Sequence, residues 1–599
     1  MKFKIKNSPA KRDPATREKF KIILLLVIIF IAAFLRLWNL NNYPAGLNAD
    51  EAAIGYNAYS LIQTGKDEHG IPWPIHFKSF GDYKPSFYFY LVLPFVKLLG
   101  LNIWAVRLPN ALLGILSVVV VMFLVKQIFG ERNVINRFSL WSGFFLAISP
   151  WHLHYSRGGW ESGVAIFFIL TGVYFFFKAL NSSKFFLLSA LFFILSLYTY
   201  HSARLVVPLL FLGLIILYRR RIFRKANLKW IVISALIGLV LLLPLVKDFL
   251  GPAGISRFSG VGLLSDTGPF WRVNELRGQH VNPWSLPVRF LHNRLVAYGL
   301  AFFSNWISHF NGNFLFVFGD IIERNRVPET GQMYFFDIFF IVFGLYFLIL
   351  KRPQNRQFIS RLQIPPASVL ADEAGKKEAD TRAENPSLRA GGGFIFLWLM
   401  VAPVAAAMTF QAPHALRANN MVIPLVIIAA YGAINLFDWF RKKKKIVRLA
   451  FYLFILLLIP WNAGRYLHEY YVHYPKTYPA AWEYGFDQLV PYLEEIKGEY
   501  EKVYVTDKYD QPYIIFLFYL KYPPEKFQKE VKLTPRDKFG FSTVRDFDKF
   551  HFEAINWDEL KTKSNILVVG TPEEINTSAT ILKRIYFKNG QTAFLVVKV

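Results

Sequence analysis

The chain has 599 residues, of which 54% are hydrophobic and 18% charged, and its formal net charge is +28. This composition is too apolar for an ordinary soluble protein of this length and is typical of a polytopic membrane protein. In a soluble protein the positive charge would suggest nucleic acid, but here the basic clusters lie between apolar segments, as expected for cytoplasmic loops, so we expect no nucleic-acid partner. The absence of cysteine excludes disulfides, thiol chemistry and thiolate metal sites.

The first apolar segment, residues 21–38, follows a basic stretch at residues 1–20. It lacks a small-residue cleavage site and many apolar segments follow it, which predicts a retained anchor with a cytoplasmic N-terminus. Because a span needs roughly 20 apolar residues, we expect about eleven crossings. The other expected spans are at about residues 108–125, 138–151, 163–180, 184–200, 203–218, 230–249, 333–350, 392–410, 419–439 and 446–462.

The first external loop expected from this topology, residues 39–107, carries two adjacent acids near the membrane surface. Asp50 and Glu51 follow Asn48 and open a helical pattern that extends to Ile62. Carboxylates in the first turn of a helix interact favourably with its dipole, which gives the pair a purely structural interpretation. A carboxylate held in this way is also suited to act as a general base.

Lys84 and Asp82 precede an aromatic segment, residues 85–99, which we expect to lie in the membrane interface. A lysine at this depth could bind the phosphate of a lipid, or it could simply extend its ammonium group toward the interface. Asp82 could be its ion-pair partner or a further acid of the site.

The second external loop, residues 149–161, is short and polar. It contains His152, His154 and Arg157, and Glu161 begins the next span, where solvation alone would also explain an acid. The two histidines are two residues apart and would not share a helical face, so they make a weak candidate for a metal site.

Two further pairs of polar residues end or connect spans on the same expected external side. They are His201 with Arg204 and His414 with Arg417. External arginines run against the charge bias of membrane loops, which indicates anionic ligands, although Arg417 could equally be the structural partner of an external acid.

The remaining segments are polar. Residues 251–332 are expected to be external, whereas residues 353–392 have the composition of a disordered cytoplasmic linker. We expect a small external α/β domain at residues 463–599, and none of its residues matches a catalytic pattern. Its signals are strand-like runs at 503–505, 566–569 and 593–599, a helical stretch at 481–497 and a hairpin turn at Asn589-Gly590.

Taken together, these motifs resemble glycosyltransferase family 39 of the GT-C superfamily, which includes protein O-mannosyltransferases and lipid A aminoarabinose transferases. The resemblance covers residues 20–220 well and the Pro-His-Ala-Leu-Arg loop at 413–417 more loosely. The matching pieces are the Leu-Arg-Leu exit at 35–37, the Asp-Glu pair, the Lys-Pro aromatic box, the Ala105–Pro109 entry and the Ser-Arg-x-x-x-Glu loop at 156–161.

The resemblance implies a polyprenyl-phosphate-linked sugar as the donor. Asp50 would then deprotonate an acceptor hydroxyl, Lys84 would bind the donor phosphate, and Glu51 and Glu161 would be further catalytic candidates. Aminoarabinose transferases have Glu-Lys-Pro where this chain has Asp82-Tyr83-Lys84-Pro85. The acid is displaced by one residue, so any metal-binding role of the family's glutamate does not transfer directly to this chain. A divalent cation remains possible, with no ligands assigned. The other candidates for binding lipid phosphate or substrate are Asp82, Arg157, His201, Arg204, His414 and Arg417.

The sequence therefore predicts a multi-pass glycosyltransferase of the cell membrane, with residues 21–462 as its GT-C transmembrane domain. It would act on a protein, lipid or polysaccharide acceptor of the cell envelope at the external face, in contact with membrane lipids. A transporter or flippase of a lipid-linked saccharide is the alternative, but inverted repeats and broken helices are not evident. A scaffold that presents the tail is a third possibility, against which the external acids and bases argue.

Overall fold

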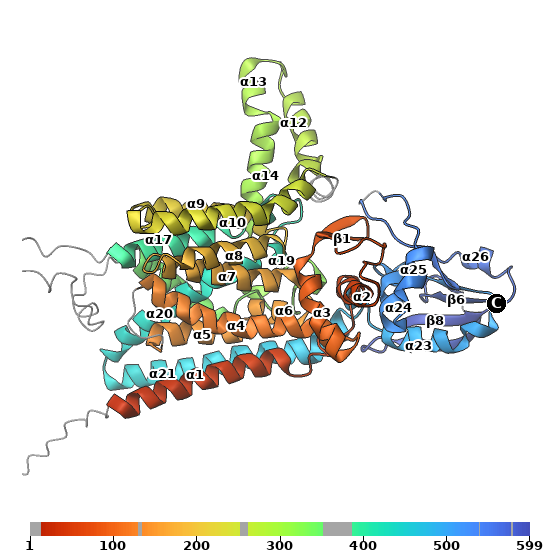
Figure 1. Cartoon of the computed structure of the whole chain (residues 1–599), viewed down its shortest axis with the longest axis horizontal. Coiled ribbons are helices and arrows are strands. Elements are labelled where there is room, and N and C mark those ends of the chain that lie inside the picture. Colours follow the sequence, from red (N-terminus) through yellow and green to blue (C-terminus); the bar gives the residue numbers. More distant parts are fainter. Residues whose placement is uncertain (1–13, 130–134, 252–261, 351–385, 538–539, 577–578) are drawn as a thin grey trace, which may run out of the picture.

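The computed structural model describes residues 14–129, 135–251, 262–350, 386–537, 540–576 and 579–599. A bundle of long helices carries an α/β domain at one end, and a helical protrusion extends sideways from the bundle (Figure 1). The expected linker at 353–392 lies almost wholly outside the described residues.

The bundle contains a helix at each of the expected spans. Six described helices are long and apolar enough to cross a membrane by length and composition, and shorter apolar helices accompany them. This is the architecture of a multi-pass membrane protein, while the number of crossings stays a prediction. The bundle helices are α1 (Pro14–Leu37), α4 (Ile103–Phe129), α5 (Arg137–Ile148), α7 (Glu161–Ala179), α8 (Phe185–Leu197), α9 (Ala203–Ile222), α10 (Lys225–Phe249), α15 (Phe335–Leu345) with η4 (Tyr346–Leu350), α17 (Pro386–Val401) with α18 (Val404–Ala407), α20 (Val422–Arg441) and α21 (Lys445–His468).

Small residues allow the bundle helices to approach closely. Where α20 meets α15, a Cβ on Gly432 would lie 1.9 Å from the Phe340 carbonyl oxygen, and one on Gly344 would lie 2.1 Å from that of Ile428. In lipid there is no hydrophobic force between helices, so such close packing supplies much of their association.

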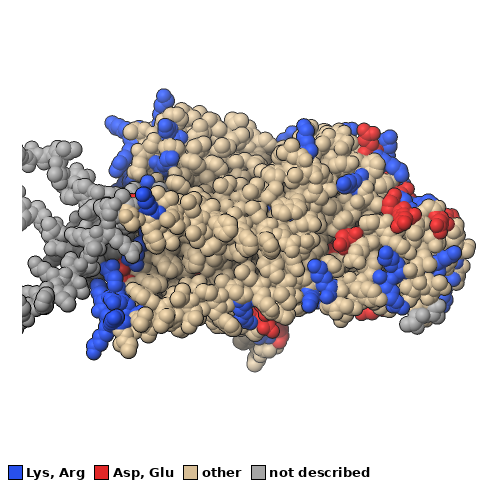
Figure 2. Space-filling model, turned by 90° about the horizontal axis from the view of Figure 1, so that it is seen from below, with Lys and Arg blue, Asp and Glu red and all other residues tan. Residues whose placement is uncertain are grey.

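Charged side chains are distributed as a membrane requires. Lys and Arg side chains gather at the end of the bundle opposite the α/β domain, and the flank between the two ends is almost free of charge (Figure 2). Charged groups are costly in hydrocarbon, so this uncharged band marks the surface that lipid covers.

The first loop folds into α2 (Ala49–Thr64), a hairpin of β1 (His76–Ser79) and β2 (Asp82–Pro85), and α3 (Phe87–Leu99). The side chain of Asn48 caps α2 by accepting a hydrogen bond of 3.0 Å from the Glu51 backbone N–H. Gly65, with φ of 70°, ends it in the left-handed conformation that glycine adopts at low cost. The helix predicted at 51–62 is therefore present, and the aromatic segment at 85–99 contains α3.

The C-terminal domain is built on a six-stranded sheet in the order β4-β5-β3-β6-β8-β7, in which β3 runs parallel to β5 and β6. The predicted strands and the hairpin at Asn589-Gly590 are present. Its elements are α23 (Phe486–Ile496), β3 (Lys502–Val505), α24 (Pro512–Leu520), α25 (Pro524–Glu530), β4 (Asp546–Phe547), β5 (Phe550–Phe552), α26 (Trp557–Leu560), β6 (Ile566–Gly570), β7 (Thr580–Tyr586) and β8 (Thr592–Lys598).

The predicted helix at 481–497 begins later, at Phe486, because the chain turns before it. Ala480–Trp482 form a 3₁₀ turn. Glu483 and Gly485 follow with φ of 45° and 109°, a backbone conformation that an α-helix cannot contain.

The C-terminal domain docks against the first loop. Its helix α24 packs on α2, and both contribute to one hydrophobic core. At the tip of the β1–β2 hairpin, the Ser542 N–H donates to the Phe80 carbonyl over 2.9 Å and Arg536 Nη2 donates to that of Gly81 over 2.6 Å. The tail is thus attached to the hairpin that carries Lys84.

Candidate functional site

Asp50 and Lys84 form an ion pair between Asp50 Oδ1 and Lys84 Nζ. Asp50 lies in the first turn of α2 and Lys84 in β2, so the fold of the first loop brings two predicted site residues together. The side chain of Lys84 is 10% exposed and that of Asp50 is 36% exposed. The carboxylate is therefore reachable from outside, while the ammonium group is mostly enclosed.

Three acids act on the charge of Lys84. Burial disfavours that charge, but Asp50, Glu161 and Asp82 outweigh the effect and raise the Lys84 pKa. Glu161 is the first residue of α7 and Asp82 the first of β2. The predicted acids of both external loops thus lie close enough to hold this ammonium group charged, the state that binds phosphate.

Glu51, next to Asp50, is placed very differently. Its two carboxylate oxygens accept hydrogen bonds of 2.8 Å from Arg107 Nε and Nη2, and Oε1 accepts another of 2.6 Å from the Gly159 N–H. Neither Glu51 nor Arg107 has exposed side-chain surface. In this structure Glu51 joins the first loop to the second and has no surface for substrate.

Arg107, to which the sequence assigned no role, fixes the chain that leads into α2. It donates hydrogen bonds of 3.1, 2.9 and 2.6 Å to the carbonyl oxygens of Leu40, Pro44 and Gly46. Arg107 lies in the Ala105–Pro109 segment that matches the family, and this match was the sequence signal that could have identified it.

Arg157 has a similar structural position. It is fully buried, and its terminal nitrogens donate to the carbonyl oxygens of Leu35, Trp38 and Tyr43 over 2.6, 2.8 and 3.0 Å. Its Nε contacts the Tyr470 hydroxyl over 3.2 Å. These contacts hold the exit of α1, and the side chain of Arg157 has no exposed surface.

His201 and Arg204 support the β1–β2 hairpin from the side of α9. His201 Nε2 contacts the Tyr83 carbonyl over 3.1 Å, and Arg204 Nη2 contacts His76 Nε2 over 2.5 Å. Burial and the Arg204 charge lower the pKa of His76 to about 4, so this ring is neutral and accepts the arginine's hydrogen bond. His76 Nδ1 in turn pairs with Asp248 of α10.

His414 caps the short helix α19 (Ala415–Ala418), which follows α18 and contains Arg417. The His414 N–H donates to His309 Nε2 over 3.1 Å, and Arg417 Nη1 donates to Thr409 Oγ1 over 2.8 Å. His414 Nδ1 is 3.8 Å from Asp320 Oδ2. These contacts join the segment after α18 to residues 309 and 320 of the connection between α10 and α15.

Three further charged residues lie near Asp50 and Lys84, and together they form the charged cluster of the site. They are Arg324, Glu483 and Asp510, and the sequence pointed to none of them. Arg324 Nη1 lies 3.9 Å from Glu483 Oε1 and 4.0 Å from Asp510 Oδ2. The charge of Asp50 acts on all three, and that of Lys84 acts on Asp510. The first loop, the connection between α10 and α15 and the C-terminal domain therefore meet at this point.

Glu483 is the most unusual of these residues. Burial raises its pKa well above the ordinary value; Arg324 opposes the shift, while Asp510 and Asp50 add to it. Its Oε2 atom is buried and has no hydrogen-bond partner among the described residues. Leaving a buried carboxyl oxygen without a hydrogen-bond partner is costly, which sets Glu483 apart from the other acids of the site.

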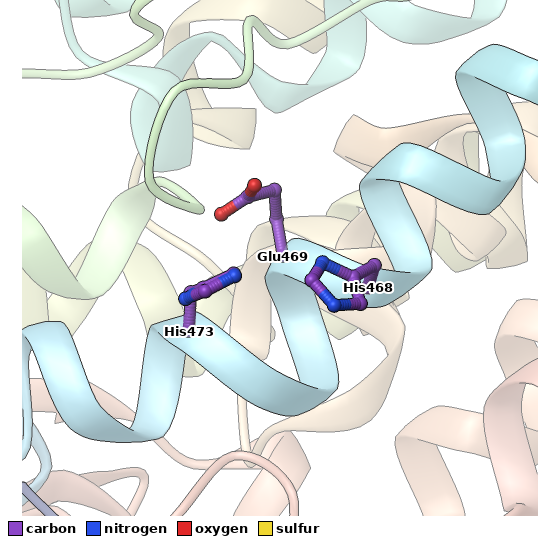
Figure 3. A group of neighbouring side chains, drawn as sticks. All are labelled: His468, Glu469 and His473. Atoms are coloured by element: carbon purple, nitrogen blue, oxygen red, sulfur yellow. The ribbon is translucent and has the colours of Figure 1, made fainter.

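One group of three side chains among the described residues has the composition of a metal site: His468, Glu469 and His473 (Figure 3). Their ligand atoms all lie within 4.8 Å of one another. The group spans the end of α21 and the π-helical turn Glu469–His473, which is wider than an α-helical turn and brings the two imidazoles, five residues apart, together. In contrast, His152 Nδ1 contacts Arg36 and His154 Nε2 contacts the Arg324 carbonyl.

Comparison with known families places this site in context. Residues 83–247 match the family model described as dolichyl-phosphate-mannose-protein mannosyltransferase. The resemblance to the GT-C glycosyltransferases is confirmed over this segment. The matched segment contains Lys84, Glu161 and the α9 residues that support the hairpin, whereas Asp50 lies before it. No curated protein sequence matches the chain significantly.

Solved structures show distant similarity. The archaeal oligosaccharyltransferase AglB from Archaeoglobus fulgidus, in complex with an inhibitory peptide and a dolichol-phosphate, has 14% identity and a TM-score of 0.46, covering 80% of this chain and 58% of AglB. ArnT from Cupriavidus metallidurans, bound to undecaprenyl phosphate, has 12% identity and a TM-score of 0.49, covering 98% of each chain. This chain thus spans little more than half of the length of AglB.

Proposed function

We propose that this protein is an integral-membrane glycosyltransferase that moves a sugar from a polyprenyl-phosphate carrier to an acceptor hydroxyl, with Asp50 as the general base. The observation that carries the proposal is the ion pair of Asp50 with Lys84. Lys84 lies in the segment that matches the mannosyltransferase family. A reachable carboxylate beside a buried ammonium group whose pKa is raised provides a base for the acceptor next to a ligand for a phosphate.

The reaction is a displacement at the anomeric carbon of the donor sugar. Asp50 takes the proton of the acceptor hydroxyl, the acceptor oxygen forms a bond to the anomeric carbon, and the bond from that carbon to the phosphate oxygen breaks. The electron pair of the broken bond stays on the polyprenyl phosphate, which leaves as an anion. A fixed cation at the point where this charge develops stabilises the transition state more than the ground state.

Lys84 is the residue for that task, and Arg324 is a second cation near the same carboxylates. In the described state Lys84 is paired with Asp50, so an incoming phosphate would exchange one anionic partner of Lys84 for another. This exchange would free the Asp50 carboxylate to accept a proton.

Glu51 and Arg107 act as positioning residues. Their buried pair joins α2 to α4 and, through the Gly159 N–H, to the loop before Glu161. Asp50 is the neighbour of Glu51 in the first turn of α2, so this pair fixes the direction in which the Asp50 side chain can point. Glu483 and Asp510 would accept hydrogen bonds from hydroxyls of the sugar or the acceptor.

We place the basic end of the bundle in the cytoplasm and the C-terminal domain outside the cell membrane. The gathering of Lys and Arg opposite that domain supports this orientation (Figure 2). A polyprenyl-phosphate donor would then reach Lys84 from the outer leaflet.

The experiment is turnover of a panel of polyprenyl-phosphate sugars by the purified full chain and by Asp50→Asn. Glu573→Gln is the matched control, because Glu573 also pairs with a lysine, Lys508, but on the exposed surface of the C-terminal domain. We expect the wild type and the control to release polyprenyl phosphate and folded Asp50→Asn to lose that release. Equal turnover in Asp50→Asn would remove it as the base, and transport of intact donor without release would favour a flippase.

A further inference from the structure

The protrusion consists of α12 (Gly268–Gly278), α13 (Leu286–Leu291) and α14 (Arg294–Ser308), and it has almost no core of its own. Within these helices only Val273 and Val288 are buried, and α14 has no buried residue. Large apolar side chains instead point outward. Trp284 is 74% exposed, Phe290 78% and Leu295 85%.

This exposure is not sustainable in water. Leaving a large apolar side chain uncovered is unfavourable relative to burying it, and three short helices with two buried valines offer little to offset that cost. Monomeric soluble proteins rarely expose a contiguous apolar patch of this kind, so something covers the protrusion in its working environment.

The position of the protrusion indicates what covers it. It leaves the side of the bundle, across the direction of the long helices and near the end that carries the C-terminal domain (Figure 1). Its helix α14 packs on α18 of the bundle, and Val240, Leu243 and Val246 of the bundle helix α10 are also exposed, on the surface that faces lipid. The protrusion and the bundle to which it is attached therefore both present apolar side chains outward.

Its polar residues suit a phospholipid surface. Arg272, Arg277, Arg289 and Arg294 accompany one acid, Glu275, which is paired with Arg272 over 2.7 Å. Arginine beside tryptophan and phenylalanine is the composition of segments that lie in a membrane interface, where the rings enter the acyl boundary and the guanidinium groups meet phosphates.

The protrusion is also held at a fixed height. Asn305 Nδ2 donates to the Thr409 carbonyl over 2.9 Å, and Trp306 Nε1 donates to that of Met400 over 3.0 Å, which ties α14 to α17 and the loop after α18. Tyr298 and Arg277 add internal ties, to the carbonyls of Asp266 and His292. The depth of the protrusion therefore follows from the depth of the bundle.

We propose that the α12–α14 protrusion lies in the phospholipid interface of the membrane that the bundle spans, on the side of the C-terminal domain, with its apolar side chains inserted into the lipid. It acts as a lateral membrane anchor that sets the tilt and depth of the helix bundle. Through His309, which follows α14 and accepts a hydrogen bond from the His414 N–H, it also supports the loop that contains Arg417.

The absence of native cysteine makes a direct test possible. Phe290→Cys and Leu295→Cys would be labelled, each alone in the full chain, with an environment-sensitive fluorophore and reconstituted into vesicles of phosphatidylcholine and phosphatidylglycerol with or without brominated acyl chains. Tyr586→Cys is the control, because Tyr586 is 48% exposed on β7 of the C-terminal domain. Bromine in both leaflets makes the result independent of the orientation of the protein in the vesicle.

We expect a blue shift and a loss of intensity with brominated lipid for labels at 290 and 295, and neither effect at 586. Labels at 290 and 295 that match the control would show that the protrusion stands in water and would overturn the proposal. A blue shift without quenching by bromine would overturn it as well, because the cover would then be protein, such as a second copy of the chain.

Discussion

Glu51 and Arg107 are joined by two hydrogen bonds of 2.8 Å in a place where neither side chain has exposed surface. Asp50, the preceding residue, is more than one-third exposed and pairs with Lys84. The two adjacent acids of the first loop thus have separate surroundings: one fixes the helix start in the protein, and the other keeps exposed surface and is the proposed base. Each setting predicts a different result when the acid is removed.

Replacing Glu51 with glutamine is expected to destabilise the protein. The substitution leaves the guanidinium of Arg107 buried without a countercharge, and breaking a buried pair in this way costs about 3–5 kcal/mol. Thermal unfolding of the purified variants should show a clear drop in the midpoint for Glu51→Gln and little change for Asp50→Asn. An unchanged midpoint for Glu51→Gln would contradict the structural assignment of this residue.

Replacing Lys84 with glutamine is expected to reduce kcat/KM for the donor by about 10²–10³-fold, the usual cost of removing one group that stabilises a developing charge. Lys78→Gln is the control, because Lys78 lies on β1 of the same hairpin, opposite Tyr83. Turnover and binding of polyprenyl phosphate would be measured for both variants. Unimpaired binding and turnover in Lys84→Gln would exclude the lysine as the phosphate ligand.

Asp510→Asn and Glu483→Gln are expected to lower turnover by raising KM for the sugar donor or the acceptor, although both residues lie in the C-terminal domain. Each change weakens a hydrogen-bond acceptor that the domain contributes to the cluster around Asp50. Asp558→Asn, a change at an acid with an 85% exposed side chain that pairs with Lys561, is the control within the same domain. If all three variants behaved alike in steady-state kinetics, the domain would contribute no binding group.

Stability is expected to fall as the pH rises from about 4.5 to about 8, because of Glu68. Burial raises the pKa of this glutamate from 4.5 to about 8; Asn57 and Lys84 oppose the shift, and Asp67 adds to it. The folded state therefore holds a proton that the unfolded state has lost, and this contribution, on the order of a few kcal/mol, disappears as the pH passes through the folded pKa. Thermal midpoints across this range should decline for the wild type and decline less for Glu68→Gln. Parallel curves would assign the decline to other groups.

Zn²⁺ is expected to bind at His468, Glu469 and His473. Two imidazoles and a carboxylate form a common ligand set for this ion, and small side-chain rotations would bring the ligand atoms to bonding distance. Titration of the tag-free chain by calorimetry should show a site that His468→Ala abolishes. The control is His280→Ala, because His280 and His292 approach to 3.1 Å without a carboxylate. Equal loss in both variants would indicate nonspecific binding to histidine.

Much of this protein was predictable from local sequence. The eleven apolar segments, the basic loops between them, the cap of α2 at Asn48 and the strands of the tail all depend on residues close together in the chain. The Lys84-Pro85 box and the acid that opens α7 were identified in the same way, through residues at short and regular spacing. Asp50 was correctly expected in the first turn of a helix.

Tertiary structure decided the rest. Glu51 and Arg107 are 56 residues apart. From the local sequence, Glu51 is as good a catalytic candidate as Asp50, and only its buried partner distinguishes the two acids. Arg324, Glu483 and Asp510 belong to no local pattern and reach the cluster because the C-terminal domain docks on α2 and the hairpin. The charge state of a carboxylate depends on its burial and on its neighbours in space, which a local pattern does not contain. The sequence therefore determined where the apolar helices lie and which loop carries the adjacent acids, and the packing of distant segments determined which of the two acids is buried and which keeps exposed surface.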